Sequence, residues 1–142
     1  MEHLIPPAPP LCPIFFTVSL RRPGADLLIL EVERLRQAVR VTRVERPFQI
    51  HAWVVLPDHL HAIWTLPDAD YAARWRLIKA RFAKGRPVWQ PRFWAQPLTT
   101  AADYDRHMRA CQMDPVRHGL VDEPGAWPFS SFQTTSALAL TG

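Results

Sequence analysis

Three short segments of the chain are rich in aromatic and β-branched residues, the composition of β-strands. The first spans residues 14–20, and the other two span residues 51–56 and 59–66. Pro57-Asp58 separates the second segment from the third and is typical of a turn. We therefore expect one strand near the start of the chain and, later, two strands joined by a tight turn.

Two further segments have apolar residues at the spacing of an amphipathic helix. In the first, Asp26 is a natural N-cap and the pattern continues to about Val41. The second starts in Pro67-Asp68-Ala69-Asp70 and is stopped by Gly85-Arg86-Pro87. Both patterns predict helices whose apolar side packs on a sheet.

Residues 88–98 form another extended segment, but two prolines limit it to an edge strand or a loop. A third helix opens at Thr100, with Asp103 three residues later in a capping-box pattern. Pro115 follows, and proline disfavours helical backbone at the residue before it. We therefore expect this helix to end at Met113 or Asp114.

The predicted order of elements is β-α-β-β-α-β-α, which indicates the α+β class: an antiparallel sheet with helices packed on it. We expect a single domain, residues 14–142, after a Pro-rich flexible leader, residues 1–13. The last part of the domain, residues 119–142, contains Trp127-Pro128-Phe129-Ser130-Ser131-Phe132. That composition predicts an irregular wrap with aromatic anchors.

The chain has 142 residues, of which 48% are hydrophobic, enough for one core and too few for two. The first residues lack the pattern of a signal peptide, and no apolar run is long enough to span a bilayer. Cys12 and Cys111 have neither the number nor the spacing of a disulfide framework or a zinc knuckle. We expect two free thiols in a protein of the reducing cytoplasm.

His59 and His61 are candidates for a functional site. Residues two apart on a β-strand point to the same face, so the two imidazoles project side by side from a predicted strand. Such a pair supplies half of a metal site, whose other ligands come from elsewhere in the chain. The alternative is an ordinary pair of half-buried histidines, and a bare His-x-His motif favours that alternative.

A long basic stretch lies between Asp70 and Asp103, where the chain has no acidic residue. Basic and aromatic residues are interleaved there, which suits nucleic acid, above all single strands or hairpins whose bases stack on rings. The alternative is a solvated helix face above a core built from those aromatics, and the composition alone favours neither. The DNA-binding candidates are Arg74, Arg76, Lys79, Arg81, Trp89 and Arg92.

Five segments, taken in order, resemble the IS200-like single-strand DNA transposases of the histidine-hydrophobe-histidine superfamily, and in particular the REP-associated tyrosine transposases. The resemblance runs from about Ile14 to Phe132. A lone His-x-His motif is weak support for a family, whereas five ordered segments are specific. The segments are residues 52–61, 74–79, 89–94, 115–121 and 127–132.

The resemblance implies a palm-like sheet of the ferredoxin or RRM type, with His59 and His61 on a central strand. It also implies a divalent cation, Mg²⁺ or Mn²⁺, that these histidines bind and that polarises a scissile DNA phosphate. In such enzymes a tyrosine on the helix after the sheet attacks the phosphate, leaving a 5′-phosphotyrosine link and a free 3′-hydroxyl. An amide residue four positions later completes the metal site, and that spacing puts both groups on one helix face. The cation helps because a phenol is a weak nucleophile near neutral pH.

The chain departs from this pattern on the third helix. Where the family typically has tyrosine, isoleucine, histidine, tyrosine, asparagine and proline, it has Ala110-Cys111-Gln112-Met113-Asp114-Pro115. The nucleophile position is therefore Ala110, which has no group able to attack a phosphate. The ligand position is Asp114, whose carboxylate suits Mg²⁺ or Mn²⁺ at least as well as an amide does.

Few other residues are candidates for the missing nucleophile. The chain has two tyrosines. Tyr104 lies roughly 240° around the helix from the nucleophile position, so we expect it to pack in the core. Tyr71 is at the start of the second helix, and no pattern brings it to the metal. His107 and Cys111 share roughly one side of the third helix with Asp114, but simple packing or exposure is favoured for both.

The sequence is compatible with three functions. The first is a transposase-class enzyme that cleaves and joins DNA strands with another nucleophile, such as metal-activated water. The second is a module that binds hairpin DNA without cleaving it, a decayed or domesticated transposase. The third, far less favoured, is a small metabolic enzyme with an iron or zinc site of two histidines and one carboxylate. The resemblance favours a monomer over a dimer, because relatives without such an aromatic wrap act as dimers.

Overall fold

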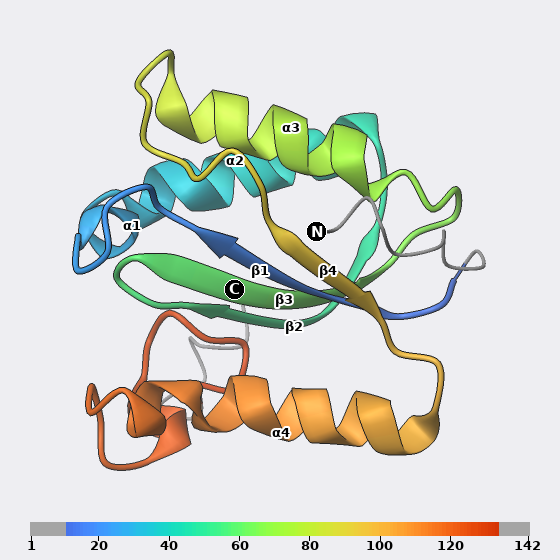
Figure 1. Cartoon of the computed structure of the whole chain (residues 1–142), viewed down its shortest axis with the longest axis vertical. Coiled ribbons are helices and arrows are strands. Elements are labelled where there is room, and N and C mark those ends of the chain that lie inside the picture. The colour runs from blue at the N-terminus through green and yellow to red at the C-terminus, as the bar shows by residue number, and fades with distance from the viewer. Residues whose placement is uncertain (1–10, 134–142) are drawn as a thin grey trace.

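The computed structural model describes residues 11–133, folded as one sheet between two helical layers (Figure 1). Most of the predicted leader, residues 1–13, and the end of the predicted wrap, residues 134–142, lie outside the described residues. The elements are β1 (Ile14–Ser19), α1 (Leu27–Leu30), α2 (Val32–Glu45), β2 (Gln49–Val55), β3 (His59–Thr65), α3 (Tyr71–Ala83), β4 (Trp94–Pro97), α4 (Ala101–Arg117) and a 3₁₀ turn, η2 (Pro124–Ala126).

The sheet has the strand order β2-β3-β1-β4, and all neighbouring strands are antiparallel. Helices α2 and α3 cover one face, and α4 covers the other (Figure 1). The predicted class, an α+β fold with helices packed on an antiparallel sheet, is confirmed. Side chains of the central strand β3 alternate between the two layers: Leu60 and Trp64 belong to the core under α2 and α3, and Ile63 to the smaller core under α4.

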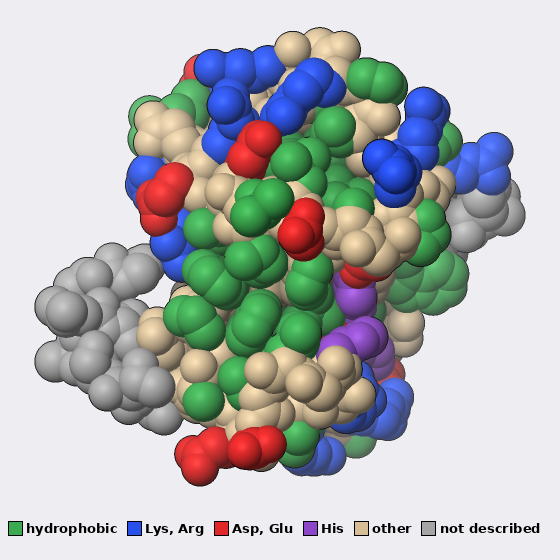
Figure 2. Space-filling view, turned by 90° about the vertical axis from the view of Figure 1, so that its left-hand side faces the viewer, with side chains coloured by type: hydrophobic (Ala, Val, Ile, Leu, Met, Phe, Trp, Pro, Cys, Tyr) green, Lys and Arg blue, Asp and Glu red, His purple; other side chains and the backbone are tan. Residues whose placement is uncertain are grey.

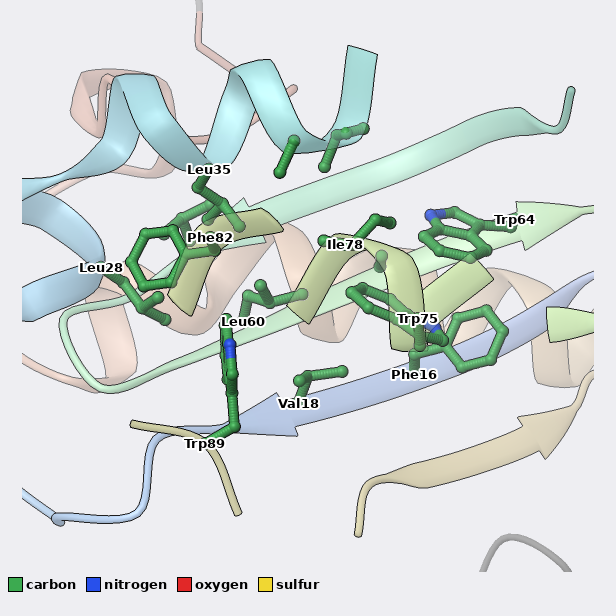
Figure 3. Packing of buried hydrophobic residues seen from close by; sticks show 14 of the residues in the cluster. Phe16, Val18, Leu28, Leu35, Leu60, Trp64, Trp75, Ile78, Phe82 and Trp89 are labelled. Atoms are coloured by element: carbon green, nitrogen blue, oxygen red, sulfur yellow. The ribbon is translucent and has the colours of Figure 1, made fainter. Parts of the chain in front are cut away.

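The larger core lies between the sheet and helices α2 and α3 (Figure 3). Trp64 of β3 stacks on Trp75 of α3 with ring centroids 4.4 Å apart, and Phe16 of β1 packs against both. Ile78 and Phe82, the next apolar residues along α3, are fully buried. Burial of a large apolar side chain contributes about 2–3 kcal/mol. This layer is therefore the main source of stability for the sheet.

The predicted turn at Pro57-Asp58 joins β2 to β3. The Leu56 N–H donates to the His59 carbonyl at 2.8 Å, which closes the hairpin. The turn also packs against α1, where the Leu28 N–H donates to the Pro57 carbonyl at 3.2 Å. The hairpin that carries the two histidines is thus fixed at its tip.

The first helix differs from its prediction. One helix was expected over residues 26–41, but the structure has α1, a break at Glu31, and α2, which continues to Glu45. At the break, φ is −115° and ψ is 35°, outside the helical region. The Glu31 carboxylate accepts hydrogen bonds from Arg34 and from Arg86, which follows α3. The break therefore coincides with a long-range ion pair that local spacing does not signal.

Helix α4 begins as predicted, with the Thr100 hydroxyl accepting from the Asp103 N–H at 3.0 Å. The predicted end at Met113 or Asp114 is wrong, because the helix passes through Pro115 and reaches Arg117. A proline near the end of a helix removes only one backbone hydrogen bond, and this proline is buried, so packing offsets the loss.

The helix ends at Arg117, and Gly119 turns the chain away from the helix axis. This residue has φ +72°, a left-handed conformation that glycine adopts without strain. Its N–H donates to the Val116 carbonyl at 2.9 Å, and the Leu120 N–H donates to the Pro115 carbonyl at 2.9 Å. These two bonds form a Schellman motif, which satisfies carbonyls of the last turn. His118 is therefore the C-cap and follows the helix face of Asp114.

The chain after η2 runs along the outer edge of β2. The Val55 N–H donates to the Phe129 carbonyl at 2.8 Å, and the Ser131 N–H donates to the Trp53 carbonyl at 2.8 Å. The Trp127 indole N–H donates to the Val55 carbonyl at 2.8 Å. Trp127 and Phe129 thus connect this segment to the edge of the sheet.

Candidate metal centre

His59 and His61 project from β3 toward α4, where Asp114 faces them. One nitrogen or oxygen atom of each residue lies within 4.8 Å of those of the other two. His61 Nε2 is 2.7 Å from Asp114 Oδ2, and the two imidazole centroids are 5.0 Å apart. The alternation of β3 puts both histidines on one face of the sheet, the face that α4 covers. The structure thus brings together the three residues that the sequence predicts as metal ligands.

The other nitrogen of each imidazole has a partner of its own. His59 Nδ1 is 2.7 Å from Asp58 Oδ1, and because an ionised carboxylate only accepts, the histidine donates. His61 Nδ1 is 2.8 Å from the hydroxyl of Thr17, its cross-strand partner on β1. Metal-binding histidines commonly donate their second ring N–H to such a group. In both rings, Nε2 is therefore the nitrogen that faces the cluster, the group formed by His59, His61 and Asp114.

Asp114 is 3% exposed, and its two oxygens have different surroundings. Oδ1 accepts a hydrogen bond from Arg117 at 2.6 Å. Oδ2 lies 2.7 Å from His61 but makes no well-aligned hydrogen bond to any described residue. Burial acts to raise the pKa of Asp114, but His61 and Arg117 outweigh it and hold the pKa at about 2. The group is therefore a buried anion at neutral pH.

Ala110 lies one helical turn before Asp114 on α4, so it follows the same face. Neither tyrosine takes its place. The Tyr104 hydroxyl is 3.4 Å from His51 Nδ1, and its ring packs in the smaller core, as predicted. Tyr71 packs on Phe16 in the larger core, beyond the opposite face of the sheet. Both tyrosines of the chain are described, and neither lies beside Asp114.

Cys111 and His107, the other two candidates for a nucleophile on α4, do not replace the tyrosine either. Cys111 is buried, and burial together with the charge of Asp114 raises the pKa of its thiol to about 12. It is therefore protonated and a poor nucleophile. His107 Nδ1 is 2.8 Å from the Asp103 carbonyl, and its ring packs on Phe15. Neither residue supplies an attacking group at the cluster.

Two residues that the sequence did not identify as candidates border the cluster. Arg117 donates to Asp114 Oδ1, and His118 Nε2 is 3.8 Å from the same oxygen. The His118 ring is also 5.3 Å from the His59 ring. Their spacing, three and four residues after Asp114, is the signal that identifies them. That signal was hidden because Pro115 indicated a helix end before them.

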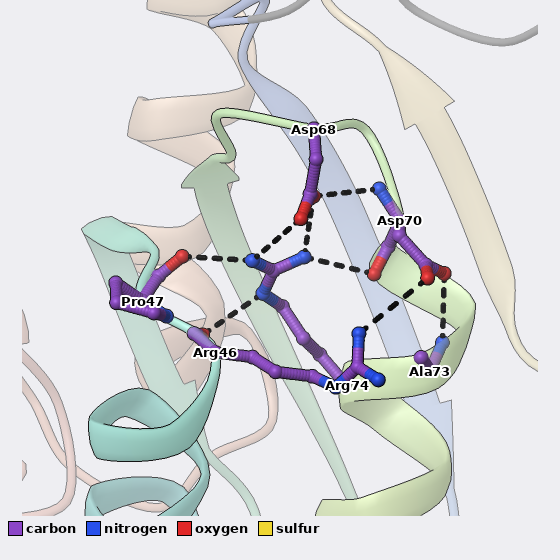
Figure 4. Close-up of polar contacts among 6 residues, drawn as sticks. All are labelled: Arg46, Pro47, Asp68, Asp70, Ala73 and Arg74. Carbon is purple, nitrogen blue, oxygen red and sulfur yellow. Dashed lines mark hydrogen bonds and ion pairs between the residues drawn. The ribbon is translucent and has the colours of Figure 1, made fainter.

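The predicted DNA-binding residues do not all share a surface with the cluster, because α3 covers the opposite face of the sheet from α4 (Figure 1). Arg74 is 1% exposed, and its guanidinium is bonded inside the protein (Figure 4). It donates to both carboxylate oxygens of Asp68 and to the carbonyls of Arg46, Pro47 and Asp70. A DNA contact by Arg74 is therefore a wrong prediction, since its five N–H donors are all used.

Two other predicted DNA contacts also have partners in the protein. Trp89 is 8% exposed and its indole N–H donates to the Lys79 carbonyl at 3.0 Å, so its ring face is not available to a base. Arg81 donates to the Thr42 hydroxyl at 2.7 Å and to Glu45 at 2.6 Å. The prediction fails for Trp89 because the aromatics of this stretch build the core. Lys79 is half-buried and donates to the Gln90 carbonyl, whereas Arg76 and Arg92 are exposed.

Other exposed basic residues lie closer to the cluster. Arg21 and Arg22 are in the loop after β1, where the Gly24 N–H donates to Asp58 Oδ2 at 2.8 Å. Asp58 in turn bonds His59, so this loop is fixed beside the metal ligands. Figure 2 shows histidine side chains at the surface with Lys and Arg side chains both above and below them. Arg117, which bonds Asp114, is exposed as well, so exposed cations lie beside the metal ligands.

No helix within residues 11–133 combines the length and the apolar character that crossing a membrane requires. No family model matches the sequence. A REP-associated tyrosine transposase of Escherichia coli (strain K12) is 44% identical over 131 residues, which cover 89% of this chain and 79% of the relative. The chain belongs to the REP-associated tyrosine transposases. A relative in Haemophilus influenzae, assigned to the same family, is 31% identical over 137 residues, 83% of this chain and 78% of the relative.

The solved structure of a REP-associated tyrosine transposase bound to a REP hairpin has the same fold. Its TM-score is 0.84 at 43% identity, over 87% of this chain and 78% of that one. A Deinococcus radiodurans structure described as a transposase has a TM-score of 0.52 at 16% identity, over 76% of this chain and 89% of the other, and shares the fold alone. The family predicted from the five sequence segments is confirmed.

The residues of the cluster fit a divalent cation. Asp114 Oδ2 is a buried, charged oxygen without a well-aligned hydrogen bond among the described residues. His59 and His61 both face it through Nε2, with their other nitrogens occupied. Two imidazoles and a carboxylate form a ligand set that leaves coordination positions open for water or a phosphate oxygen.

Proposed function

We propose that this protein binds single-stranded or hairpin DNA, places a DNA phosphate at a divalent cation held by His59, His61 and Asp114, and forms no covalent link to the DNA. The convergence of the three ligands beside Ala110 carries the proposal, because it combines a complete ligand set with an inert nucleophile position. The relative that is bound to a REP hairpin and shares 43% identity supports hairpin DNA as the partner.

The residues of the chain prepare the site before DNA arrives. Asp58 and Thr17 fix the two imidazoles, so the ligands need little rearrangement. Arg21, Arg22 and Arg117 are exposed cations near the ligands and attract a phosphate. A divalent cation bound there supplies Lewis-acid polarisation of the phosphate oxygen.

The described groups around the cluster do not include a nucleophile able to form a stable link to DNA. Ala110 has a methyl group, the Cys111 thiol is buried and protonated, and both tyrosines pack elsewhere. A non-cleaving DNA-binding protein is therefore the function that the geometry supports best. A strand-cleaving enzyme that uses water as nucleophile is the alternative outcome of the experiment below.

Restoring the phenol tests the proposal. We expect the unaltered protein to bind a labelled DNA hairpin in the presence of Mg²⁺ or Mn²⁺ and to give no cleavage. Ala110→Tyr is expected to gain a DNA adduct that survives denaturation, together with a fragment ending in a 3′-hydroxyl. The adduct is expected to disappear when His59→Ala or His61→Ala is added. Met113→Tyr is the matched control, because it places a tyrosine on the same helix at a position that is 39% exposed.

The other possible results would each contradict a different part of the proposal. Cleavage without an adduct by the unaltered protein would show a hydrolytic enzyme. Absence of DNA binding would remove the proposed partner, and binding that does not weaken steeply with salt would exclude the basic surface. An Ala110→Tyr variant that binds DNA but stays inert would show that the metal ligands no longer serve catalysis.

A further inference from the structure

A third imidazole lies at the candidate metal centre. His118 Nε2 is 3.8 Å from Asp114 Oδ1, and the His118 ring is 5.3 Å from that of His59. The His59 ring is in turn 5.0 Å from that of His61. Three imidazoles and one carboxylate therefore meet between β3 and the end of α4.

The passage of α4 through Pro115 puts His118 there. The helix continues to Arg117, and the His118 N–H donates to the Asp114 carbonyl at 3.0 Å, the bond of a regular helical turn. Residues four apart on a helix are neighbours on its surface. Gly119 then turns the chain away through its positive φ of +72°. The backbone thus places His118 one helical turn after Asp114, on the same side of α4.

The His118 side chain is able to move the short distance that coordination requires. It is 48% exposed, and its ring makes no hydrogen bond within the described part of the chain. Imidazole nitrogens and carboxylate oxygens bind Zn²⁺ at about 2.0–2.2 Å, so two ligands of a tetrahedral site lie about 3.4 Å apart. The observed separation of 3.8 Å is close to that value.

Arg117 does not block this arrangement. It donates to Asp114 Oδ1, and its side chain is 60% exposed, so it can turn outward when a cation takes its place beside the buried carboxylate. Asp114 Oδ2 remains, facing His61 without a well-aligned hydrogen bond. Oδ2 therefore faces His61 while Oδ1 lies 3.8 Å from His118, so the carboxylate connects His118 to the other two imidazoles.

We infer that His118 is a fourth ligand of the metal centre, which makes it a site of three imidazoles and one carboxylate. A DNA phosphate oxygen is then a fifth ligand, because such sites expand to five-coordinate. This inference rests on the proposed function, because it needs the site of His59, His61 and Asp114 to bind a cation. Mg²⁺ prefers oxygen ligands, whereas imidazole suits first-row transition metals. The site therefore takes Co²⁺ or Zn²⁺ in preference to Mg²⁺.

Metal binding by the full, metal-free chain tests the inference without any measurement of activity. Co²⁺ is titrated and followed by its visible absorption, and Mg²⁺ binding is measured by competition. We expect His118→Gln to weaken Co²⁺ at least about tenfold and to leave Mg²⁺ within about threefold, since only the nitrogen ligand is lost. X-ray absorption of the Zn²⁺-loaded protein is expected to show three imidazoles, and two in His118→Gln.

His51→Gln is the control. It removes an imidazole whose two nitrogens face Thr65 and Tyr104, outside the cluster, and is expected to leave Co²⁺ binding unchanged. Equal Co²⁺ affinity and equal spectra for the unaltered protein and His118→Gln, with loss only in His59→Gln, would overturn the inference and retain the three-ligand site. Absence of Co²⁺ binding in the unaltered protein would remove the proposed site itself.

Discussion

Thr17 and His61 are direct cross-strand partners on β1 and β3, and the Thr17 hydroxyl is 2.8 Å from His61 Nδ1. The contact lies on the α4 face of the sheet. It fixes the imidazole so that the other nitrogen, Nε2, faces Asp114 at 2.7 Å. The orientation of this ligand is therefore set by the register of two strands and does not depend on a bound cation.

Thr17→Val is expected to weaken divalent-cation binding about tenfold, because the histidine loses the partner that fixes its ring. Calorimetric titration with Mn²⁺ and Co²⁺ measures the change. Thr65→Val is the control: the Thr65 hydroxyl is 3.2 Å from His51 Nε2, a similar contact on β3 outside the metal ligands. Equal loss in both variants would mean that the effect comes from the strand and not from the ring.

The low pKa of Asp114 predicts that the metal-free protein becomes less stable as the pH falls. The pKa of this carboxyl is lowered from 3.8 to about 2 in the folded state, so the unfolded chain takes up its proton first as the pH falls. The stabilisation, about 2 kcal/mol, is present above pH 4 and is lost between about pH 4 and pH 2.

Urea unfolding at several pH values checks this prediction. The pKa values of Asp58 and Asp68 are also lowered in the folded state, so part of the acid effect comes from them. The informative quantity is the difference between the unaltered protein and Asp114→Asn, which should shrink through that pH range. A constant difference would show that the charge of Asp114 contributes nothing.

Cys111 is expected to be unreactive in the folded protein. Its thiol is 1% exposed and its pKa is raised to about 12, so the thiolate that reacts with disulfide reagents is scarce at pH 8. In Cys12→Ser, Cys111 is the remaining thiol, and reaction should become fast only after urea is added. Rapid labelling of that variant without urea would show that the α4 layer opens readily.

Arg74 is expected to support folding and not DNA binding. Arg74→Ala leaves the carbonyls of Arg46, Pro47 and Asp70 without their donor and should lower the free energy of unfolding by about 3 kcal/mol. Arg76→Ala, at an exposed position of the same helix, should change it by less than about 0.5 kcal/mol. Urea unfolding of the two variants checks this difference, and equal stability would contradict it.

The elements that the sequence predicts correctly are those with a local cause. The turn at Pro57-Asp58 and the two-residue period of β3 place His59 and His61 on one face without any long-range contact. The Thr100 cap is likewise a contact between residues three apart. These features depend on neighbours along the chain, and the chain shows them directly.

The features that the sequence does not predict depend on contacts between distant segments. Arg74 is buried because carbonyls of the α2–β2 connection accept its hydrogen bonds, 27 and 28 residues away. The sequence shows a basic residue at that position but not the acceptors that surround it. Pro115 is a local signal whose effect is reversed by packing, and His118 was hidden for the same reason.

The segment after η2 also affects how copies of the protein can meet. A strand at the edge of a sheet has unpaired backbone groups that can pair with another chain. Here Phe129 and Ser131 pair with Val55 and Trp53 at one end of β2, and the opposite edge of the sheet is β4, four residues long and ending in Pro97. Two copies that form one continuous sheet through this end of β2 must first displace these bonds.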